Sequence, residues 1–245
     1  MKIYVSPSRQ TANLYATGGT NEAVQCQAIG ELVGELLQKY KDTEVYVAPA
    51  SQTALERGDQ AKAEGYDCML CLHTNASGSA SKGQANGTLG IYYQGDYKTV
   101  TLSEEQILRN KEFAQKLVES VSQLTGKDLG VKATQQTELV FCGCTGALIE
   151  FEFHDNQYGS DYIQEHHKEL AEAAVTAVAD FFGLQQKSEE EPPAEDDRFY
   201  CVQCGAYKDK ENAQRQLERL QAAGFSCYII IKNTDSKTYE DYHGA

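Results

Sequence analysis

The sequence of 245 residues lacks the features of a membrane or secreted protein. No stretch approaches the roughly 20 consecutive apolar residues that a membrane-spanning helix needs, so we expect no membrane partner. The first ten residues, MKIYVSPSRQ, contain one lysine and no apolar run, and therefore do not predict a signal peptide. We expect the protein to remain cytoplasmic until it is released by lysis or by a route that reads no such signal.

Basic residues are also scarce. The chain has 22 Lys and Arg against 36 Asp and Glu, which gives a net charge of −14. Residues 188–197 carry six of these acids and no basic residue. Because a nucleic-acid partner requires a basic face, we do not expect one.

The eight cysteines lie mostly in apolar, strand-like runs. This placement predicts reduced, buried side chains rather than a disulfide framework. Cys201 and Cys204 have the spacing of half a zinc knuckle. In a strand, however, residues three apart point to opposite faces, which favours a structural role.

Short apolar runs alternate with helical periods over the first 183 residues. This order predicts an α/β fold, with a twisted, mostly parallel sheet and helices on both faces. Residues 67–73 are almost continuously apolar, as in a strand that is covered on both sides. Strands are also expected at 139–141 and 147–153, and one final helix at about 161–182.

Composition changes abruptly at residues 185–198, which are acidic and contain Pro192 and Pro193. Charge repulsion and the two prolines predict an extended linker. The chain is therefore expected to contain a large domain, residues 1–184, and a small strand–helix–strand unit, residues 199–245.

Four short motifs carry a family resemblance: SPSRQ at 6–10, TNE at 20–22, LHTNA at 72–76 and LIEFEFHDN at 148–156. Together with the order of strands and helices, they resemble the zinc-dependent N-acetylmuramoyl-L-alanine amidases. These enzymes cleave the amide bond between N-acetylmuramic acid and L-alanine in peptidoglycan. The resemblance implies that peptidoglycan is the partner and that Zn²⁺ is the cofactor.

The resemblance also implies roles for individual residues. Glu22 and His73 match two zinc ligands, and Glu150 matches the catalytic glutamate. Where the family has its first ligand histidine, this chain has Arg9, which has no lone pair for a metal. Catalytic zinc sites normally use three protein ligands and a water, so either another residue replaces the histidine or the metal is lost.

His154 is the candidate replacement. Strand alternation would place Glu150, Glu152 and His154 on one face, with His154 near the carboxyl end of the strand. The chain resembles a subset of amidases that begin S-P-S-x-Q and end F-H-D-N, which favours His154 as the third ligand. The alternative is a hydrogen bond within a turn. Arg9, Asn75 and Glu152 are expected to bind substrate. For Arg9 the alternatives are a pair with Glu152 and a pair with a neighbouring residue on the surface.

The C-terminal unit resembles the first half of a sporulation-related repeat (SPOR) domain, through V-Q-x-G-A-Y and the A-A-G-F that precedes a strand. Such domains bind peptidoglycan glycan strands. Half a module leaves strand edges unpaired, so we expect it to be poorly ordered alone or completed by self-association.

Two other functions remain open from the sequence. Loss of the metal through Arg9 would leave a catalytically inactive cell-wall binding protein. A similar set of Glu and His residues would also serve a zinc peptidase that acts on cell-wall peptides.

Overall fold

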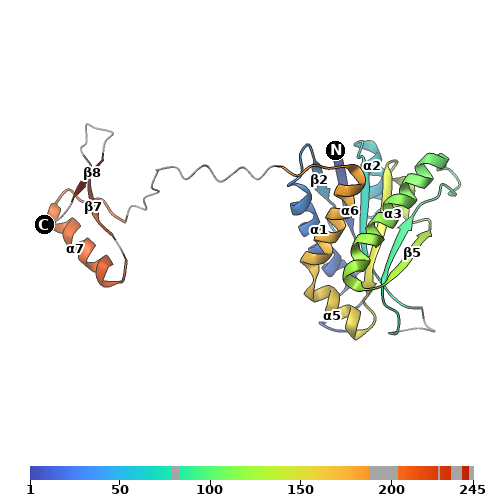
Figure 1. Cartoon of the computed structure of the whole chain (residues 1–245), viewed down its shortest axis with the longest axis horizontal. Coiled ribbons are helices and arrows are strands. Elements are labelled where there is room, and N and C mark those ends of the chain that lie inside the picture. Colours follow the sequence, from blue (N-terminus) through green and yellow to red (C-terminus); the bar gives the residue numbers. More distant parts are fainter. Residues whose placement is uncertain (79–82, 188–203, 226, 233–238, 243–245) are drawn as a thin grey trace. The chain divides into compact units, whose positions relative to one another are not determined.

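A computed structural model separates the chain into two compact units, Met1–Glu190 and Glu191–Ala245 (Figure 1). None of the described helices combines the length and apolar character needed to cross a membrane. Most of the predicted linker lies outside the described residues, and the division at residues 184 and 198 remains a prediction. The structure describes residues 1–78, 83–187, 204–225, 227–232 and 239–242.

The first unit is built on a six-stranded sheet with the order β2-β1-β3-β6-β4-β5. β2, β1, β3 and β6 are parallel to one another, whereas β4 is antiparallel to β6 and parallel to β5. This mixed, mostly parallel sheet confirms the predicted fold class. The strands are β1 (Lys2–Pro7), β2 (Glu44–Val47), β3 (Cys68–Asn75), β4 (Thr88–Tyr92), β5 (Asp128–Ala133) and β6 (Thr145–Phe153).

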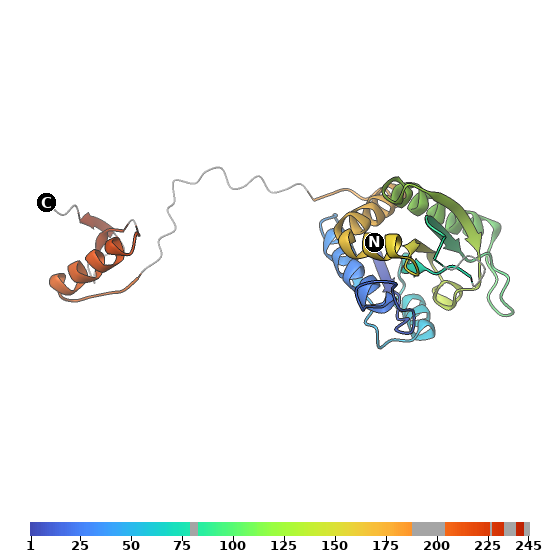
Figure 2. The same cartoon turned by 90° about the horizontal axis from the view of Figure 1, so that it is seen from below.

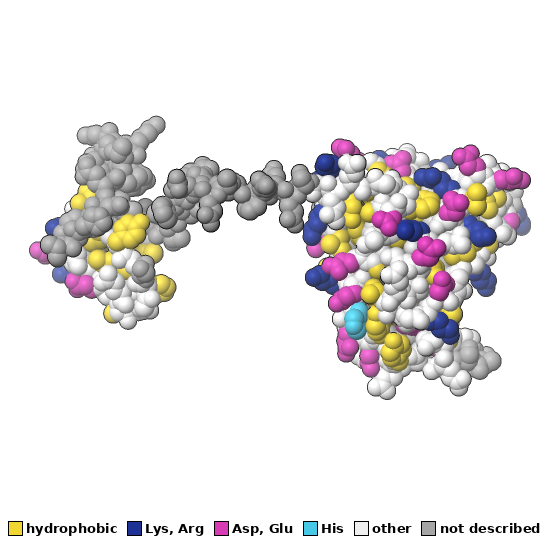
Figure 3. Space-filling view, viewed as in Figure 1, with side chains coloured by type: hydrophobic (Ala, Val, Ile, Leu, Met, Phe, Trp, Pro, Cys, Tyr) yellow, Lys and Arg dark blue, Asp and Glu magenta, His cyan; other side chains and the backbone are white. Residues whose placement is uncertain are grey.

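Helices cover both faces of this sheet (Figure 2). Alternation along β1 divides the core, because Ile3 and Val5 pack with α1, α3 and α6, whereas Tyr4 packs with α2 and α4 on the other face. On the side of the unit shown in Figure 3, Lys and Arg are interspersed with Asp and Glu. The helices are α1 (Glu22–Leu37), α2 (Ala54–Ala63), α3 (Glu104–Thr125), α4 (Thr137–Phe141), α5 (Gln157–Glu165) and α6 (His167–Phe182).

Two local predictions were wrong, and one strand was not predicted. Residues 139–141 form the end of helix α4 instead of a strand, because three apolar residues fit either structure. The predicted helix at 161–182 is interrupted at His166, whose φ of −123° lies outside the helical range. The edge strand β5 was not predicted, although Leu129, Val131 and Ala133 stand at alternate positions along it.

The second unit contains α7 (Lys210–Ala222), which is the helix of the predicted strand–helix–strand unit. Asp209 caps it, since its Oδ1 accepts from the backbone N–H groups of Glu211 at 2.8 Å and Asn212 at 3.2 Å. β7 (Ile229–Lys232) pairs antiparallel with β8 (Tyr239–Tyr242). Cys201, of the possible half knuckle, lies outside the described residues.

Candidate active site

The carboxyl ends of β1, β3 and β6 bring the sequence motifs together. β1 and β3 are paired up to Pro7 and Leu72, and β3 and β6 pair His73 with Glu150. Helix α1 begins beside them at Glu22, because the Oδ1 atom of Asn21 accepts from the backbone N–H of Val24 at 3.1 Å. Residues distant in sequence therefore meet at one edge of the sheet, where ligands bind in open α/β folds.

Glu22 and His73 form a buried pair. The Oε1 atom of Glu22 lies 2.9 Å from the Nδ1 atom of His73, and the glutamate side chain is almost fully buried. Burial alone would raise the pKa of Glu22, but hydrogen bonds from His73 and Asn13 hold that pKa below its usual range. Burial alone would lower the pKa of His73, but the hydrogen bond to Glu22 and the charge of Glu150 raise it.

Glu150 lies next to this pair. Its Oε2 atom and the Nε2 atom of His73 are buried and have no hydrogen-bond partner among the described residues. Burial raises the pKa of Glu150 to about 7, against the opposing effect of His73. A carboxyl group with such a pKa exchanges a proton near neutral pH, as a general acid–base group requires.

His154 is held at the end of β6. Its Nδ1 atom lies 3.1 Å from the carbonyl oxygen of Thr74 and 3.0 Å from the Oγ1 atom of the same residue. Tyr15 stacks on the imidazole with the ring centroids 5.0 Å apart. Because a carbonyl only accepts, Nδ1 carries the proton and Nε2 keeps its lone pair. Metal-binding histidines commonly have this arrangement.

These donors suit zinc chemically. Glu22 and His73 place a carboxylate oxygen and an imidazole nitrogen 2.9 Å apart, and His154 provides a second imidazole. Throughout the part of the chain that the structure describes, however, no three or more His, Cys, Asp or Glu side chains are grouped so that they could hold a metal ion. The structure therefore shows an assembled pair of donors and a separate third candidate.

A bulge in β6 separates the residues that alternation would have placed together. Between His73 and Asn75 on β3, the register advances three residues on β6, from Glu150 to Phe153. The extra residue in β6 interrupts the alternation of its side chains between the two faces of the sheet. Glu150 therefore lies beside His73, whereas Glu152 and His154 have other partners, and the predicted common face is wrong.

Glu152 is fully buried, and its two carboxylate oxygens accept from the backbone N–H of Gly87 at 2.8 and 2.9 Å. The backbone N–H of Phe153 also donates to it, at 2.8 Å. This carboxylate anchors the backbone before β4 and is completely buried, and its expected part in substrate binding stays a prediction.

The other two expected substrate-binding residues lie nearer the surface. Arg9 is exposed just after β1. Asn75 is half-buried at the end of β3, where its Oδ1 atom accepts from the backbone N–H of Ala76 at 2.9 Å. Both are in positions that a substrate could reach.

Sequence reasoning assigned no role to two amides of the site. The Nδ2 atom of Asn13 donates to the Oε2 atom of Glu22 at 2.6 Å and to the Oε1 atom of Gln10 at 3.1 Å. The Nε2 atom of Gln10 lies 3.4 Å from Nδ1 of His73. Gln10 belongs to the SPSRQ motif, and its position directly after the first strand could have indicated that it lies at the site.

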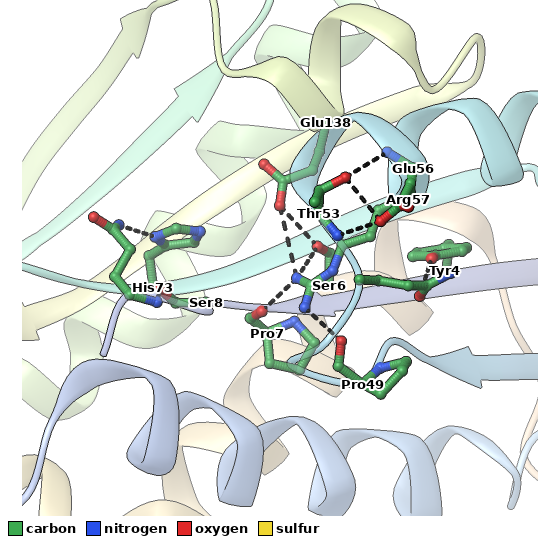
Figure 4. A network of polar contacts seen from close by, with 12 residues as sticks. Tyr4, Ser6, Pro7, Ser8, Pro49, Thr53, Glu56, Arg57, His73 and Glu138 are labelled. Atoms are coloured by element: carbon green, nitrogen blue, oxygen red, sulfur yellow. Dashed lines mark hydrogen bonds and ion pairs between the residues drawn. The ribbon is translucent and has the colours of Figure 1, made fainter. Parts of the chain in front are cut away.

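A buried arginine supports the end of β1. Arg57 of α2 is fully buried, and its Nη1 atom donates to the Oγ atom of Ser6 at 2.9 Å and to the carbonyl of Pro7. Its Nη2 atom donates to the carbonyl of Pro49 at 3.0 Å, and Nη1 lies 3.7 Å from Glu138 of α4 (Figure 4). Arg57 thus fixes the backbone from which the SPSRQ segment leaves the sheet.

Comparisons with known proteins agree with this architecture. Among solved structures, an N-acetylmuramoyl-L-alanine amidase from Clostridium difficile 630 is 19% identical with a TM-score of 0.64, covering 74% of this chain and 96% of that one. The catalytic domain of CwlV, an N-acetylmuramoyl-L-alanine amidase from Bacillus (Paenibacillus) polymyxa, is 16% identical with a TM-score of 0.63. The match covers 76% of this chain and 100% of that one. At these identities, the likeness establishes the fold.

The family profiles extend this result. The SPOR domain profile matches residues 196–240. No curated protein matches the chain. The profile described as N-acetylmuramoyl-L-alanine amidase matches residues 3–180, which is most of the chain. The chain therefore belongs to the N-acetylmuramoyl-L-alanine amidase family.

Proposed function

We propose that this peptidoglycan hydrolase cleaves the amide bond between N-acetylmuramic acid and L-alanine with the help of a zinc ion. The observation that carries the proposal is the buried contact of 2.9 Å between Glu22 and His73, with Glu150 paired to His73 across the sheet. A carboxylate, an imidazole and a second carboxylate thus meet at one edge of the sheet in a chain of the amidase family.

Glu22 and His73 would hold the zinc, and His154 would supply the third ligand through its Nε2 atom. When bound, zinc lowers the pKa of a coordinated water and polarises the amide carbonyl. Thr74 supports the role of His154, because the hydrogen bonds to Nδ1 fix the tautomer and the ring orientation. Stacking by Tyr15 restricts the ring further.

Glu150 would act as the general base and then as the general acid. Its Oε2 atom has no hydrogen-bond partner among the described residues, so it is available to take a proton from the attacking water. The same atom would return that proton to the amine of L-alanine as the amide bond breaks.

Two outer residues would bind the substrate. Arg9 is exposed, and its guanidinium would pair with a carboxylate of the stem peptide. Asn75 would contact the substrate with its amide nitrogen, because its Oδ1 atom is engaged by Ala76.

The second unit would attach the enzyme to its substrate. SPOR domains bind peptidoglycan, and the profile match at residues 196–240 supports this role. We further propose that unpaired strand edges in this unit are completed by a second copy of the chain.

A cell-wall binding protein without catalysis is the second candidate. Two observations favour it. Within the described residues, no three metal-donor side chains are grouped together, and Arg9 stands in place of a histidine ligand. Metal content and the cleaved bond decide between the two functions.

The test is metal analysis of the purified protein beside His73→Ala and His154→Ala. His166→Ala is the matched control, since His166 lies between α5 and α6 and bonds the carbonyl of Tyr162. We expect about one zinc per chain in the wild type and the control, and loss of most zinc and activity in the other two. Digested peptidoglycan should show new N-terminal amines on L-alanine.

Each result against the proposal identifies a different error. A wild type without zinc that releases no L-alanine amine would indicate the binding protein. New amines on other stem residues would indicate a peptidase. Full zinc occupancy and normal turnover in His154→Ala would place the third ligand elsewhere.

A further inference from the structure

Gln10 is an exposed residue whose amide lies against the buried pair of the site. Its Nε2 atom is 3.4 Å from the Nδ1 atom of His73 and 3.5 Å from the Oε1 atom of Glu22. Glu22 is fully buried and His73 is nearly so. The amide of Gln10 is therefore located between this pair and the solvent from which a substrate arrives.

Asn13 fixes which end of the Gln10 amide faces the pair. The Nδ2 atom of Asn13 donates to the Oε2 atom of Glu22 at 2.6 Å and to the Oε1 atom of Gln10 at 3.1 Å. The reverse orientation would oppose two NH₂ groups and would bring the amide oxygen of Gln10 close to the carboxylate of Glu22. Gln10 therefore directs its two N–H bonds toward the pair.

The neighbours of Gln10 do not satisfy these N–H bonds well. The Nδ1 atom of His73 lies 2.9 Å from a carboxylate oxygen, so it holds either a proton or a metal there and has no lone pair left for Gln10. The contact with Glu22, at 3.5 Å, is longer than an ordinary N–H···O hydrogen bond. An oriented donor thus faces the reacting centre without a strong acceptor.

We propose that Gln10 is a catalytic residue that donates a hydrogen bond to the scissile carbonyl oxygen of the substrate. This inference rests on the proposed amidase function. As water attacks the amide carbon, the carbonyl oxygen gains negative charge, and a donor already in place stabilises that charge without reorganisation. The neutral amide of Gln10 suits this role, since it adds no positive charge beside the zinc ligands.

The experiment measures Gln10→Ala and Gln10→Glu with a soluble muramoyl-peptide. Gln38→Ala is the matched control, because Gln38 is also exposed but follows the opposite end of α1. For each protein, kcat, KM and the affinity for zinc are determined, the last by competition with a chelating dye. Thermal unfolding checks that each variant is folded.

We expect Gln10→Ala to lower kcat about a hundredfold, as for the loss of one oxyanion donor. KM and the zinc affinity should remain within about twofold, because a donor to the transition state contributes little to ground-state binding. Gln10→Glu should lose at least as much activity as Gln10→Ala, since a carboxylate cannot donate. Gln38→Ala should behave as the wild type.

Two results would overturn the inference alone. A kcat of Gln10→Ala within about threefold of an active wild type would show that no such donor is needed. A zinc affinity that falls in parallel with kcat would make Gln10 a supporting residue of the metal pair. A wild type that binds zinc but releases no L-alanine amine would instead overturn the proposed function, and this inference with it.

Discussion

Replacement of Glu150 by glutamine should stabilise the metal-free protein while it removes activity. Burial raises the pKa of Glu150 from 4.5 to about 7, so the folded protein prefers the neutral carboxyl group. The contribution of this carboxyl group to the free energy of unfolding is fully present below pH 4.5, where the group is neutral in both states. It is lost as the pH rises through about 7, because the buried group must then ionise. Glutamine is neutral at every pH and therefore avoids that loss.

The size of the effect follows from the two pKa values. At about 1.4 kcal/mol for each pKa unit, the interval from 4.5 to about 7 corresponds to about 3 kcal/mol. Above pH 7.5, the free energy of unfolding of Glu150→Gln should therefore exceed that of the wild type by up to about 3 kcal/mol. Near pH 4 the two proteins should be about equal.

The assay is urea unfolding in the presence of a metal chelator at several pH values between 4 and 8. Glu105→Gln, which removes an exposed carboxylate of α3, is the control for a change of net charge. Wild-type and Glu150→Gln curves that stay parallel over this range would show that the Glu150 carboxyl group is not desolvated. With zinc present, the variant should keep the metal and lose about a hundredfold or more in rate. Near-normal turnover would refute the catalytic role of Glu150.

Two predictions concern the support of the site and the second unit. Arg57→Met should lower the free energy of unfolding by about 3 to 5 kcal/mol, because it leaves Glu138 buried without its cation. The double variant Arg57→Met/Glu138→Gln should recover part of this loss, and urea unfolding measures both. An equal loss in the single and double variants would argue against this ion pair. Deletion of residues 188–245 should leave the thermal unfolding of the first unit and its rate of hydrolysis of soluble muropeptides unchanged. The deletion should weaken binding to intact sacculi and abolish self-association, which light scattering measures. Unchanged binding to sacculi would exclude the second unit as the attachment module.

The sequence by itself determined the class of fold and the strand ends that carry the chemistry. The alternation of apolar runs with helical periods predicted the α/β sheet, because each period depends only on neighbouring residues. Asn21 is a residue type that favours helix N-termini, and it caps α1 at Glu22. The same local information placed His73 near the end of a strand.

Local periodicity did not reveal the irregularities of the chain. Residues 139–141 form part of α4, because a short apolar run fits a helix as well as a strand. The bulge in β6 directs Glu152 to the backbone of Gly87 and away from the side of Glu150. A bulge depends on the pairing of two strands, so the sequence of one strand does not disclose it.

Only the tertiary structure decided which side chains meet. Gln10 lies 63 positions before His73, yet their nitrogen atoms are 3.4 Å apart. Ser6 donates to Glu138 across 132 positions, and Arg57 joins the same buried network. Such contacts depend on strand order, register and the entry point of each helix, and these are set by the packing of the whole core. The sequence could therefore supply the candidate residues, whereas their distances and partners required the assembled fold.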